Sequence, residues 1–545
     1  MTYRTPKFAL ASIAAIACLA LPRPANTQAA APQTPADDFR TAERCANCHS
    51  NLKTPKGENV SISLQWSASI MANAARDPYW QGSVRRETLD HPESSAVIQN
   101  ECSRCHMPLQ ALADQAQGHQ TELFSRLPLR TDHDPAAADG VSCTVCHQIQ
   151  PTGLGTPDSY SGNFTVAAPG THPRPLFGPW APDSDNINKV HVLASGYSVA
   201  QAAQIHDAAL CGSCHTLYTT TLGPGGKQIG KLPEQMPYLE WLHSDYRDRQ
   251  TCQQCHMPAV TEPVAIASLM GKPREGVRLH TFVGANFLMD SMFTAHRDEL
   301  SVAAQPSDLA AATAQVTSFL QSQSARITLS SAQLSASDLS FAVRVDNLTG
   351  HKLPTAYPSR RAWLHVVVTA ADGHSVFESG KLNPDGSIVG NANDADPTHF
   401  SPHYMRITQP DQVEIFEPIL GDSQGHVTTG LISATQYLKD NRILPTGFDK
   451  QTASPDIAVS GEAAGDPDFT AGSCTTHYAV STNGAAGPLH VSVELLYQPV
   501  GYRWAHNLAT YQAAEPQRFV HYYEQAAAKS AVVLAHAETS VDPAP

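Results

Sequence analysis

Three stretches in the second half of the chain carry large apolar residues at every second position. The first stretch, LSFAVRVDN, has these residues at 339, 341, 343 and 345. The stretches WLHVVVTA and LHVSVELL repeat the pattern. The apolar positions of the three runs are Leu339, Phe341, Val343, Val345, Leu364, Val366, Val368, Leu489, Val491, Val493 and Leu495. A period of two places these side chains on one face of a strand, and turn signals (ADG, PDG, TNG) lie between such runs. The pattern predicts an antiparallel β-sandwich domain over residues 326–512.

The first half of the chain has no sustained alternation. Residues 31–300 contain short apolar stretches with frequent proline and glycine, which predicts a mostly helical, loop-rich domain. Residues 301–325 are rich in Ala, Gln and Ser and predict a connecting helix with Leu309, Val316 and Leu320 facing inward. Residues 513–545 predict a short helix followed by a returning tail. The predicted fold class is therefore α+β with more than one domain, as the length of 545 residues also favours.

The N-terminus has the pattern of an export signal. Arg4 and Lys7 precede an apolar run at Phe8–Leu21, and small residues follow it, so residues 1–30 are predicted to be a signal peptide. Neither this run nor any other is long enough to predict an integral membrane span. A lipid anchor at Cys18 is less favoured, because Ala15 stands where the usual lipoprotein pattern prefers leucine. The expected location is periplasmic or secreted.

Overall charge excludes one class of partner. The formal net charge is -14, and only 16% of the residues are charged. Binding to nucleic acid requires clustered Lys and Arg, so no nucleic acid is expected as a partner.

Cysteine spacing supplies the strongest chemical signal in the sequence. Ten of the twelve cysteines fall in five copies of the pattern CxxCH. The copies are Cys45, Cys48 and His49; Cys102, Cys105 and His106; Cys143, Cys146 and His147; Cys211, Cys214 and His215; and Cys252, Cys255 and His256. A thioredoxin-like site needs one CxxC and no following histidine, and zinc sites give no reason for a histidine after every second cysteine. Covalent haem requires this pattern, because two thiols bind the vinyl groups and the adjacent imidazole reaches the iron. The sequence predicts five haem c groups with these histidines as proximal ligands.

Only two cysteines remain outside the motifs. Cys18 lies in the predicted signal peptide, which leaves Cys474 as the single non-motif cysteine of the mature chain. The mature chain is therefore expected to form no internal disulfide.

The sixth ligand of each iron determines what a haem can do. A second His or a Met makes an electron carrier, whereas an open position permits substrate chemistry. Candidate distal ligands within the predicted haem domain are His206, His243 and His280, which lie close to motifs or follow the last one. Met71 is a weaker candidate, since its place in WSASIMANAARD equally suits a helix core.

Several stretches together resemble a family of exported multihaem c-type cytochromes with a cytochrome c554-like haem domain and a C-terminal β-domain. The resemblance covers residues 60–520 and rests on DGVSCTVCHQI, ALCGSCHTLYT, PEQMPYLEWLHSDY, CQQCHMP, HTFVGAN, TGHKLPTAYPSRRAWLHV and YLKDNRILPTGF. The resemblance implies that His351, in GHKLPT, reaches back from the β-domain to a haem. It also implies that His243 and His280 are distal ligands.

Taken together, these patterns favour an electron-transfer protein over an enzyme. The chain would carry electrons along five haems between redox protein partners, whose identity the sequence does not give. One alternative is an oxidoreductase of the nitrite-reductase or hydroxylamine-oxidising type with one open haem. A second alternative is a subunit of a haem filament, a homo-oligomer in which a histidine is donated across the interface.

Overall fold

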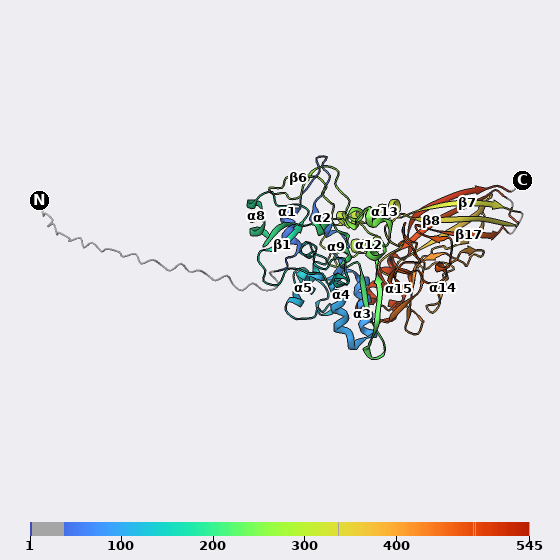
Figure 1. The fold of residues 1–545 in the computed structure, drawn as a ribbon, viewed down its shortest axis with the longest axis horizontal. Helices are drawn as coiled ribbons and strands as arrows, with labels where there is room; N and C mark the ends of the chain where they lie inside the picture. Colours follow the sequence, from blue (N-terminus) through green and yellow to red (C-terminus); the bar gives the residue numbers. More distant parts are fainter. Residues whose placement is uncertain (3–37, 336, 483, 486, 544–545) are drawn as a thin grey trace.

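The structure is a computed structural model that describes residues 1–2, 38–335, 337–482, 484–485 and 487–543. The predicted signal peptide lies outside the described residues except for its first two positions, and so does Cys18. The described chain is elongated in Figure 1, with the elements of its first half at one end and the long strands of its second half at the other.

Short helices dominate the first half of the chain. The α-helices are α1 Ala42–His49, α2 Ile62–Ser67, α3 Pro78–Asp90, α4 Ser95–His106, α5 Pro108–Ala116, α6 Pro135–Ala138, α7 Cys143–Cys146, α8 Asp185–Ser195, α9 Ala208–Gly212, α10 Pro237–Leu242, α11 Cys252–His256, α12 Phe287–Ala295, α13 Pro306–Gln323, α14 Ala392–Ala395, α15 Tyr502–Asn507 and α16 Ala514–Ala526. Helix α3 shows why such helices begin where they do: Pro78 occupies its first turn, and the Asp77 carboxylate accepts hydrogen bonds from the backbone N–H groups of Tyr79 and Trp80. None of the helices in the described ranges is long and apolar enough to cross a membrane.

The strands lie mainly in the second half. They are β1 Arg174–Gly178, β2 Tyr197–Gln201, β3 Leu217–Leu222, β4 Gln228–Gln235, β5 Val264–Ala265, β6 Pro273–Arg274, β7 Ala325–Leu334, β8 Asp338–Asn347, β9 Arg361–Ala370, β10 Ser375–Ser379, β11 Arg406–Ile407, β12 Ile415–Phe416, β13 Pro418–Asp422, β14 Val427–Thr428, β15 Ala434–Asp440, β16 Phe469–Thr470, β17 Ser473–Ser481, β18 Leu489–Gln498 and β19 Val532–Val541.

Two five-stranded sheets contain the long strands. One has the order β10-β9-β18-β19, with β12 also paired to β9, and the other has the order β11-β17-β8-β7, with β16 paired to β17. Neighbouring long strands are antiparallel throughout, while the short β11 runs parallel to β17. All apolar positions predicted from the alternation in β8, β9 and β18 are buried, with exposed fractions of 3% or less. The period-two pattern therefore identified both these strands and their inward faces.

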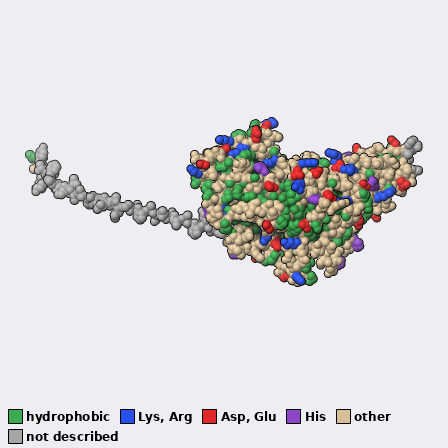
Figure 2. Space-filling model, viewed as in Figure 1, with side chains coloured by type: hydrophobic (Ala, Val, Ile, Leu, Met, Phe, Trp, Pro, Cys, Tyr) green, Lys and Arg blue, Asp and Glu red, His purple; other side chains and the backbone are tan. Residues whose placement is uncertain are grey.

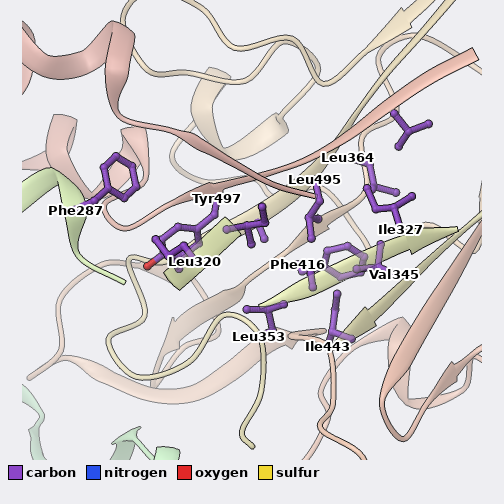
Figure 3. Close-up of a cluster of buried hydrophobic side chains, with 14 of the residues drawn as sticks. Phe287, Leu320, Ile327, Val345, Leu353, Leu364, Phe416, Ile443, Leu495 and Tyr497 are labelled. Atoms are coloured by element: carbon purple, nitrogen blue, oxygen red, sulfur yellow. The ribbon is translucent and has the colours of Figure 1, made fainter. Parts of the chain in front are cut away.

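One hydrophobic core joins the two sheets to the helices before them. The cluster contains residues from β7, β8, β9 and β18 together with α12 and α13. Figure 3 shows Val345, Leu364 and Leu495 among the strands, with Phe287 and Leu320 from the helices near Tyr497. Helix α13 occupies the segment predicted to be a connecting helix, and Leu309, Val316 and Leu320 are its buried residues.

The C-terminal segment extends the sheet beyond the predicted boundary at residue 512. Residues 532–541, predicted to be part of a returning tail, form β19, which pairs with β18 along its length. Helix α16 precedes this strand and packs against α3 from the first half of the chain. Small and charged residues interrupt the apolar alternation of β19, so its strand character depends on the partner strand.

The first half also contains strands that its composition did not predict. Strands β3 and β4 form an antiparallel hairpin around Pro224–Gly226. Proline and glycine at this turn were visible in the sequence, but the flanking strands carry mixed polar residues. In Figure 2, hydrophobic side chains gather over the part of the molecule that carries α1, α9 and α12, while the end that carries β7, β8 and β17 shows few of them.

Candidate haem-binding site

The five CxxCH motifs lie at the ends of short helices. Helices α1, α4 and α11 end at the motif histidines, α7 ends one residue before its histidine, and α9 ends within its motif. Residues three apart lie on the same side of a helical turn, so the two cysteines of a motif face one side. The histidine follows directly from the end of that turn. This local geometry suits two thioether bonds to one planar ring with the imidazole beneath it.

Cysteines of different motifs lie next to one another. In three pairs, the thiol of one motif is the largest influence on the pKa of a thiol in another motif: Cys45 with Cys143, Cys105 with Cys214, and Cys211 with Cys252. All these cysteines are free thiols in the described residues. The first motif therefore adjoins the third, and the fourth adjoins both the second and the fifth. Ring systems attached to these cysteines would be close neighbours.

A single large cavity connects all five motifs. Its volume is about 1900 Å³, and every motif cysteine and histidine lines it. Pockets for small ligands usually measure about 300–1,000 Å³, so this cavity suits several cofactors rather than one. Most of its surface is apolar, as the edges of a porphyrin require. The residues present therefore fit haem c: paired thiols, an adjacent imidazole and an apolar chamber of sufficient size.

Four of the motif histidines are oriented by backbone carbonyl groups. The Nδ1 atoms lie against the oxygens of Ile266, Ala74, Phe177 and Val283, at 2.6 Å for His49, 3.1 Å for His106, 2.6 Å for His147 and 2.5 Å for His256. With the proton on Nδ1, each ring donates to its carbonyl and turns the lone pair of Nε2 into the cavity. Histidines that bind metals are usually held in this way.

Burial keeps the motif histidines neutral. It lowers the pKa of all five, to about 4 for His106 and His215. A neutral imidazole has the free lone pair that an iron ligand needs. These side chains are therefore ready to bind a metal at neutral pH without first releasing a proton.

Two predicted distal ligands lie opposite motif histidines. The ring centres of His147 and His280 are 6.5 Å apart, and those of His256 and His351 are 6.3 Å apart. Both pairs have ring planes inclined by 15°. A metal–imidazole bond is about 2 Å long, and the ring centre lies about 1 Å behind the nitrogen, so two imidazoles on opposite sides of one iron have centres about 6 Å apart. The observed spacing matches that arrangement.

His280 and His351 are also held in the orientation of metal ligands. Their Nδ1 atoms lie 3.0 Å from the backbone oxygens of Arg278 and Lys352 respectively. Burial lowers the pKa of each to about 4. His280 belongs to the loop before α12, whereas His351 belongs to the loop between β8 and β9, so the second half of the chain contributes to the cavity.

A buried charge network fixes the loop that carries His351. The Nζ atom of Lys352 donates to Asp440 Oδ2 at 2.7 Å, and Arg442 donates to both oxygens of the same carboxylate. Glu240, from α10, accepts a hydrogen bond from the backbone N–H of Lys352 at 3.1 Å and pairs with Arg442 at 3.0 Å. The stretches EWLH, GHKLPT and YLKDNR, far apart in sequence, therefore meet at one place.

Three other predicted distal ligands have different surroundings. His243 directs Nε2 to the backbone oxygen of Asp449 at 2.9 Å and packs against Phe448, and it is not among the residues that line the cavity. His206 and Met71 both line the cavity. Within the described residues, no ring contact pairs His206 with a motif histidine.

His191 lines the cavity although no sequence pattern marked it as a candidate ligand. It lies on α8 and directs Nδ1 to the backbone oxygen of Tyr197 at 2.9 Å. Burial is the main cause of the lowered pKa of His49, and the neighbouring imidazoles of His191 and His147 add to it. His191 therefore shares the orientation of the other cavity histidines and lies near the first motif. The only signal in the surrounding sequence is that of the helix itself, which has Ser184 as its N-cap and Gly196 as its C-cap.

Buried polar side chains complete the cavity wall. Glu234 accepts hydrogen bonds from Thr219 and Gln235, and burial raises its pKa to about 7. Its charge acts on the thiols of Cys102 and Cys105. Arg360 also lines the cavity. Burial is the main cause of the lowered pKa values of His215, His256 and His351, and the charge of Arg360 lowers them further.

The fold of this chain is similar to that of a protein of known structure. No protein-family model and no curated protein matches the chain. Among solved structures, the chain shares the fold of a multihaem cytochrome c. The similar structure is that of the penta-heme cytochrome c552 from Thermochromatium tepidum, with a TM-score of 0.51 and 16% sequence identity. The match covers 92% of this chain and 99% of the other.

Proposed function

We propose that this protein is an exported pentahaem c-type cytochrome that carries electrons between redox proteins of the cell envelope. The observation that carries the proposal is the pairing of His147 with His280 and of His256 with His351, at the spacing of two imidazoles on one iron. Two imidazole ligands leave such an iron no open position, which favours electron transfer over substrate chemistry. The fold shared with a penta-heme cytochrome supports the same assignment.

The chain's own residues would hold and tune the cofactors. Each pair of motif cysteines would attach one haem, and the following histidine would bind its iron from one side. When bound, haem supplies reversible one-electron chemistry, while the protein sets spacing, ligation and polarity. The contacts between cysteines of different motifs support close packing of neighbouring haems. Electrons could then pass along the chain of motifs without leaving the cavity.

We assign distal ligands to three of the five sites. His280 would serve the site of His147, and His351 would serve the site of His256. His191 would serve the site of His49, because its Nδ1 is held by a backbone carbonyl and its ring lies near that of His49. His206 and Met71 line the cavity and remain candidates for the second and fourth sites.

We propose a domain organisation that fits a pentahaem cytochrome. Residues 31–300 would form the haem domain and residues 301–325 the connecting helix. The later strands would form a β-sandwich, supported by two five-stranded sheets that share one core. With β19 included, this domain would extend to residue 541. The apolar run after Arg4 and Lys7 supports export by a signal peptide.

The spin states of the oxidised holoprotein test this proposal. We expect intact mass spectrometry to show five attached haems and low-temperature EPR to show low-spin iron at the paired sites. In His280→Ala and His351→Ala, one haem each should become high-spin with no loss of haem. His243→Ala is the matched control and should leave all spectra unchanged, because its Nε2 is engaged with Asp449.

The opposite results would contradict the proposal. A wild-type protein whose high-spin haem binds nitrite, hydroxylamine or cyanide would be an oxidoreductase with an open iron. Ligation that changes with protein concentration would instead indicate a filament subunit that receives a histidine from a second copy.

A further inference from the structure

Four ionisable side chains meet in the strand-rich part of the molecule, outside the haem cavity. His403 lies in the loop before β11, Glu414 directly precedes β12, Asp466 precedes β16, and Cys474 lies on β17. Their exposed fractions are 4%, 0%, 1% and 1% respectively. None of the four lines the haem cavity. Burial of so many polar groups is costly unless they are paired or bind a metal.

Three of these side chains converge with one ligand atom each. A ring nitrogen of His403, a carboxylate oxygen of Asp466 and the sulfur of Cys474 all lie within 4.8 Å of one another. The His403 Nε2 atom is 2.9 Å from Asp466 Oδ2. Asp466 is fixed by its other oxygen, which accepts a hydrogen bond from the backbone N–H of Asp468 at 2.8 Å. Small side-chain shifts would place all three atoms around one ion.

Glu414 orients the histidine from behind. Its Oε1 atom accepts a hydrogen bond from Nδ1 of His403 at 2.7 Å and one from Asn441 Nδ2 at 2.7 Å. Its Oε2 atom accepts a hydrogen bond from the backbone N–H of Tyr404 at 2.5 Å. With the proton on Nδ1, the lone pair of His403 Nε2 points toward Asp466 and Cys474. A carboxylate behind the imidazole is the usual second partner of a histidine that binds zinc.

We propose that His403, Asp466 and Cys474 bind a zinc ion, with Glu414 as the positioning residue. Nitrogen, thiolate sulfur and carboxylate oxygen are the ligand types that zinc takes in proteins. Calcium and magnesium prefer oxygen ligands alone, so the thiol and imidazole argue against them. The ion would join β17, the segment before β16 and the loop before β11. It would stabilise this end of the molecule and would take no part in electron transfer.

The metal content of the full-length holoprotein tests the proposal. We expect inductively coupled plasma mass spectrometry to find one zinc for every five haem irons in protein purified without a metal-affinity tag. After dialysis against a chelator, the thermal midpoint should fall, and added zinc chloride should restore it. These measurements on the wild type remain valid even if a variant fails to fold.

Variants then locate the ion. Cys474→Ser and Asp466→Asn should lose the zinc while keeping five haems, measured by the pyridine haemochrome spectrum. Glu414→Gln should weaken zinc binding about 10- to 100-fold, the usual effect of losing a partner behind a metal-binding histidine. His477→Ala is the matched control, because His477 lies on the same strand and pairs with Asp468 at the surface. That control should retain the zinc.

Three results would overturn the proposal. The first is a wild-type protein that contains no zinc and whose thermal midpoint of unfolding does not change when zinc chloride is added. His403 would then be an imidazolium between the carboxylates of Glu414 and Asp466. The second is zinc that binds Cys474→Ser as tightly as the wild type. The third is another metal, such as copper, in equal amount with the chain.

Discussion

At the residue scale, the carboxyl group of Glu234 lies where it can influence a haem potential. It is buried in the wall of the cavity, its pKa is raised to about 7 by burial, and its charge acts on the thiols of Cys102 and Cys105. The first four residues of β4 are exposed and only Leu232 and Glu234 are buried, so the polar sequence of this strand does not single out Glu234 for this role. Its importance follows from the fold.

The protonation of Glu234 should make one midpoint potential depend on pH. Below its pKa the group is neutral, and above it the carboxylate stabilises the more positive ferric state. We therefore expect the potential of the haem at Cys102 and Cys105 to fall between about pH 6 and pH 8. Glu234→Gln should remove this dependence and raise the potential at the upper end of the range, as measured by spectroelectrochemical titration.

Glu538→Gln is a suitable comparison, because Glu538 is 59% exposed on β19. It should leave the titration unchanged. A pH dependence that persists in Glu234→Gln would assign the effect to another group, such as a haem propionate.

At the scale of elements, the network of Glu240, Lys352, Asp440 and Arg442 explains why three separate stretches of sequence belong together. It joins α10, the loop that carries His351 and the end of β15. Burial alone would raise the pKa of Asp440, but Arg442 and Lys352 hold it at about 2. The charges are thus paired in the interior. Removal of one of them should lower the stability of the protein and alter the position of His351.

Removal of the central carboxylate should be strongly destabilising. Asp440→Asn leaves the buried Lys352 without its carboxylate partner and leaves Arg442 paired with Glu240 alone. We expect a cost of about 3–5 kcal/mol in the free energy of unfolding. Guanidinium unfolding followed by circular dichroism measures this cost. We also expect high-spin character at the haem of His256, because the loop of its partner His351 loosens.

The same pairing predicts an acid-dependent stability. The pKa of Asp440 lies below its ordinary value of 3.8, so its contribution is complete above about pH 4 and is lost as the pH falls toward 2. Asp468→Asn removes a half-exposed partner of His477 and should change the stability by at most about 1 kcal/mol. An equal effect of both variants would contradict the role given to the network.

At the scale of the whole molecule, the two halves of the chain are interlocked. Helix α16, near the C-terminus, packs against α3, where Arg85 and Glu515 form a salt bridge at 2.8 Å. Gly82 permits this approach, since a side chain there would meet the backbone of Pro516 at 3.3 Å. His351, from the loop between β8 and β9 in the strand-rich half, lines the cavity of the first half. The part of the molecule around the cavity therefore depends on the rest of the chain for packing and for His351, one of the histidines that line it.

The net charge should govern encounters with redox partners. A protein with a formal net charge of -14 attracts cations, and salt screens this attraction beyond about 10 Å at 0.1 M. We expect the reduced protein to be oxidised faster by a cationic complex such as hexaammineruthenium(III) as the salt concentration falls. Oxidation by ferricyanide should show the opposite trend. Stopped-flow rates at a series of salt concentrations measure both, and equal trends would contradict electrostatic steering.

Several features of this protein were determined by the sequence itself. The CxxCH motifs predict haem attachment because covalent chemistry acts between neighbours in the chain. The alternation in β8, β9 and β18 identifies strands and their buried faces because the period of a strand is local, and the helix at α13 follows from its composition. These patterns need no knowledge of distant contacts.

The tertiary structure alone decided the rest. His191 approaches a motif far away in sequence, whereas His243, which lies close to a motif in sequence, turns toward Asp449. The family resemblance suggested His351, but only the structure shows that it faces His256. The cluster around Cys474 and the strand β19 likewise exist only through partners from other segments. Such contacts form because burial of the common core brings remote segments together. The spacing of residues along the chain therefore does not predict them.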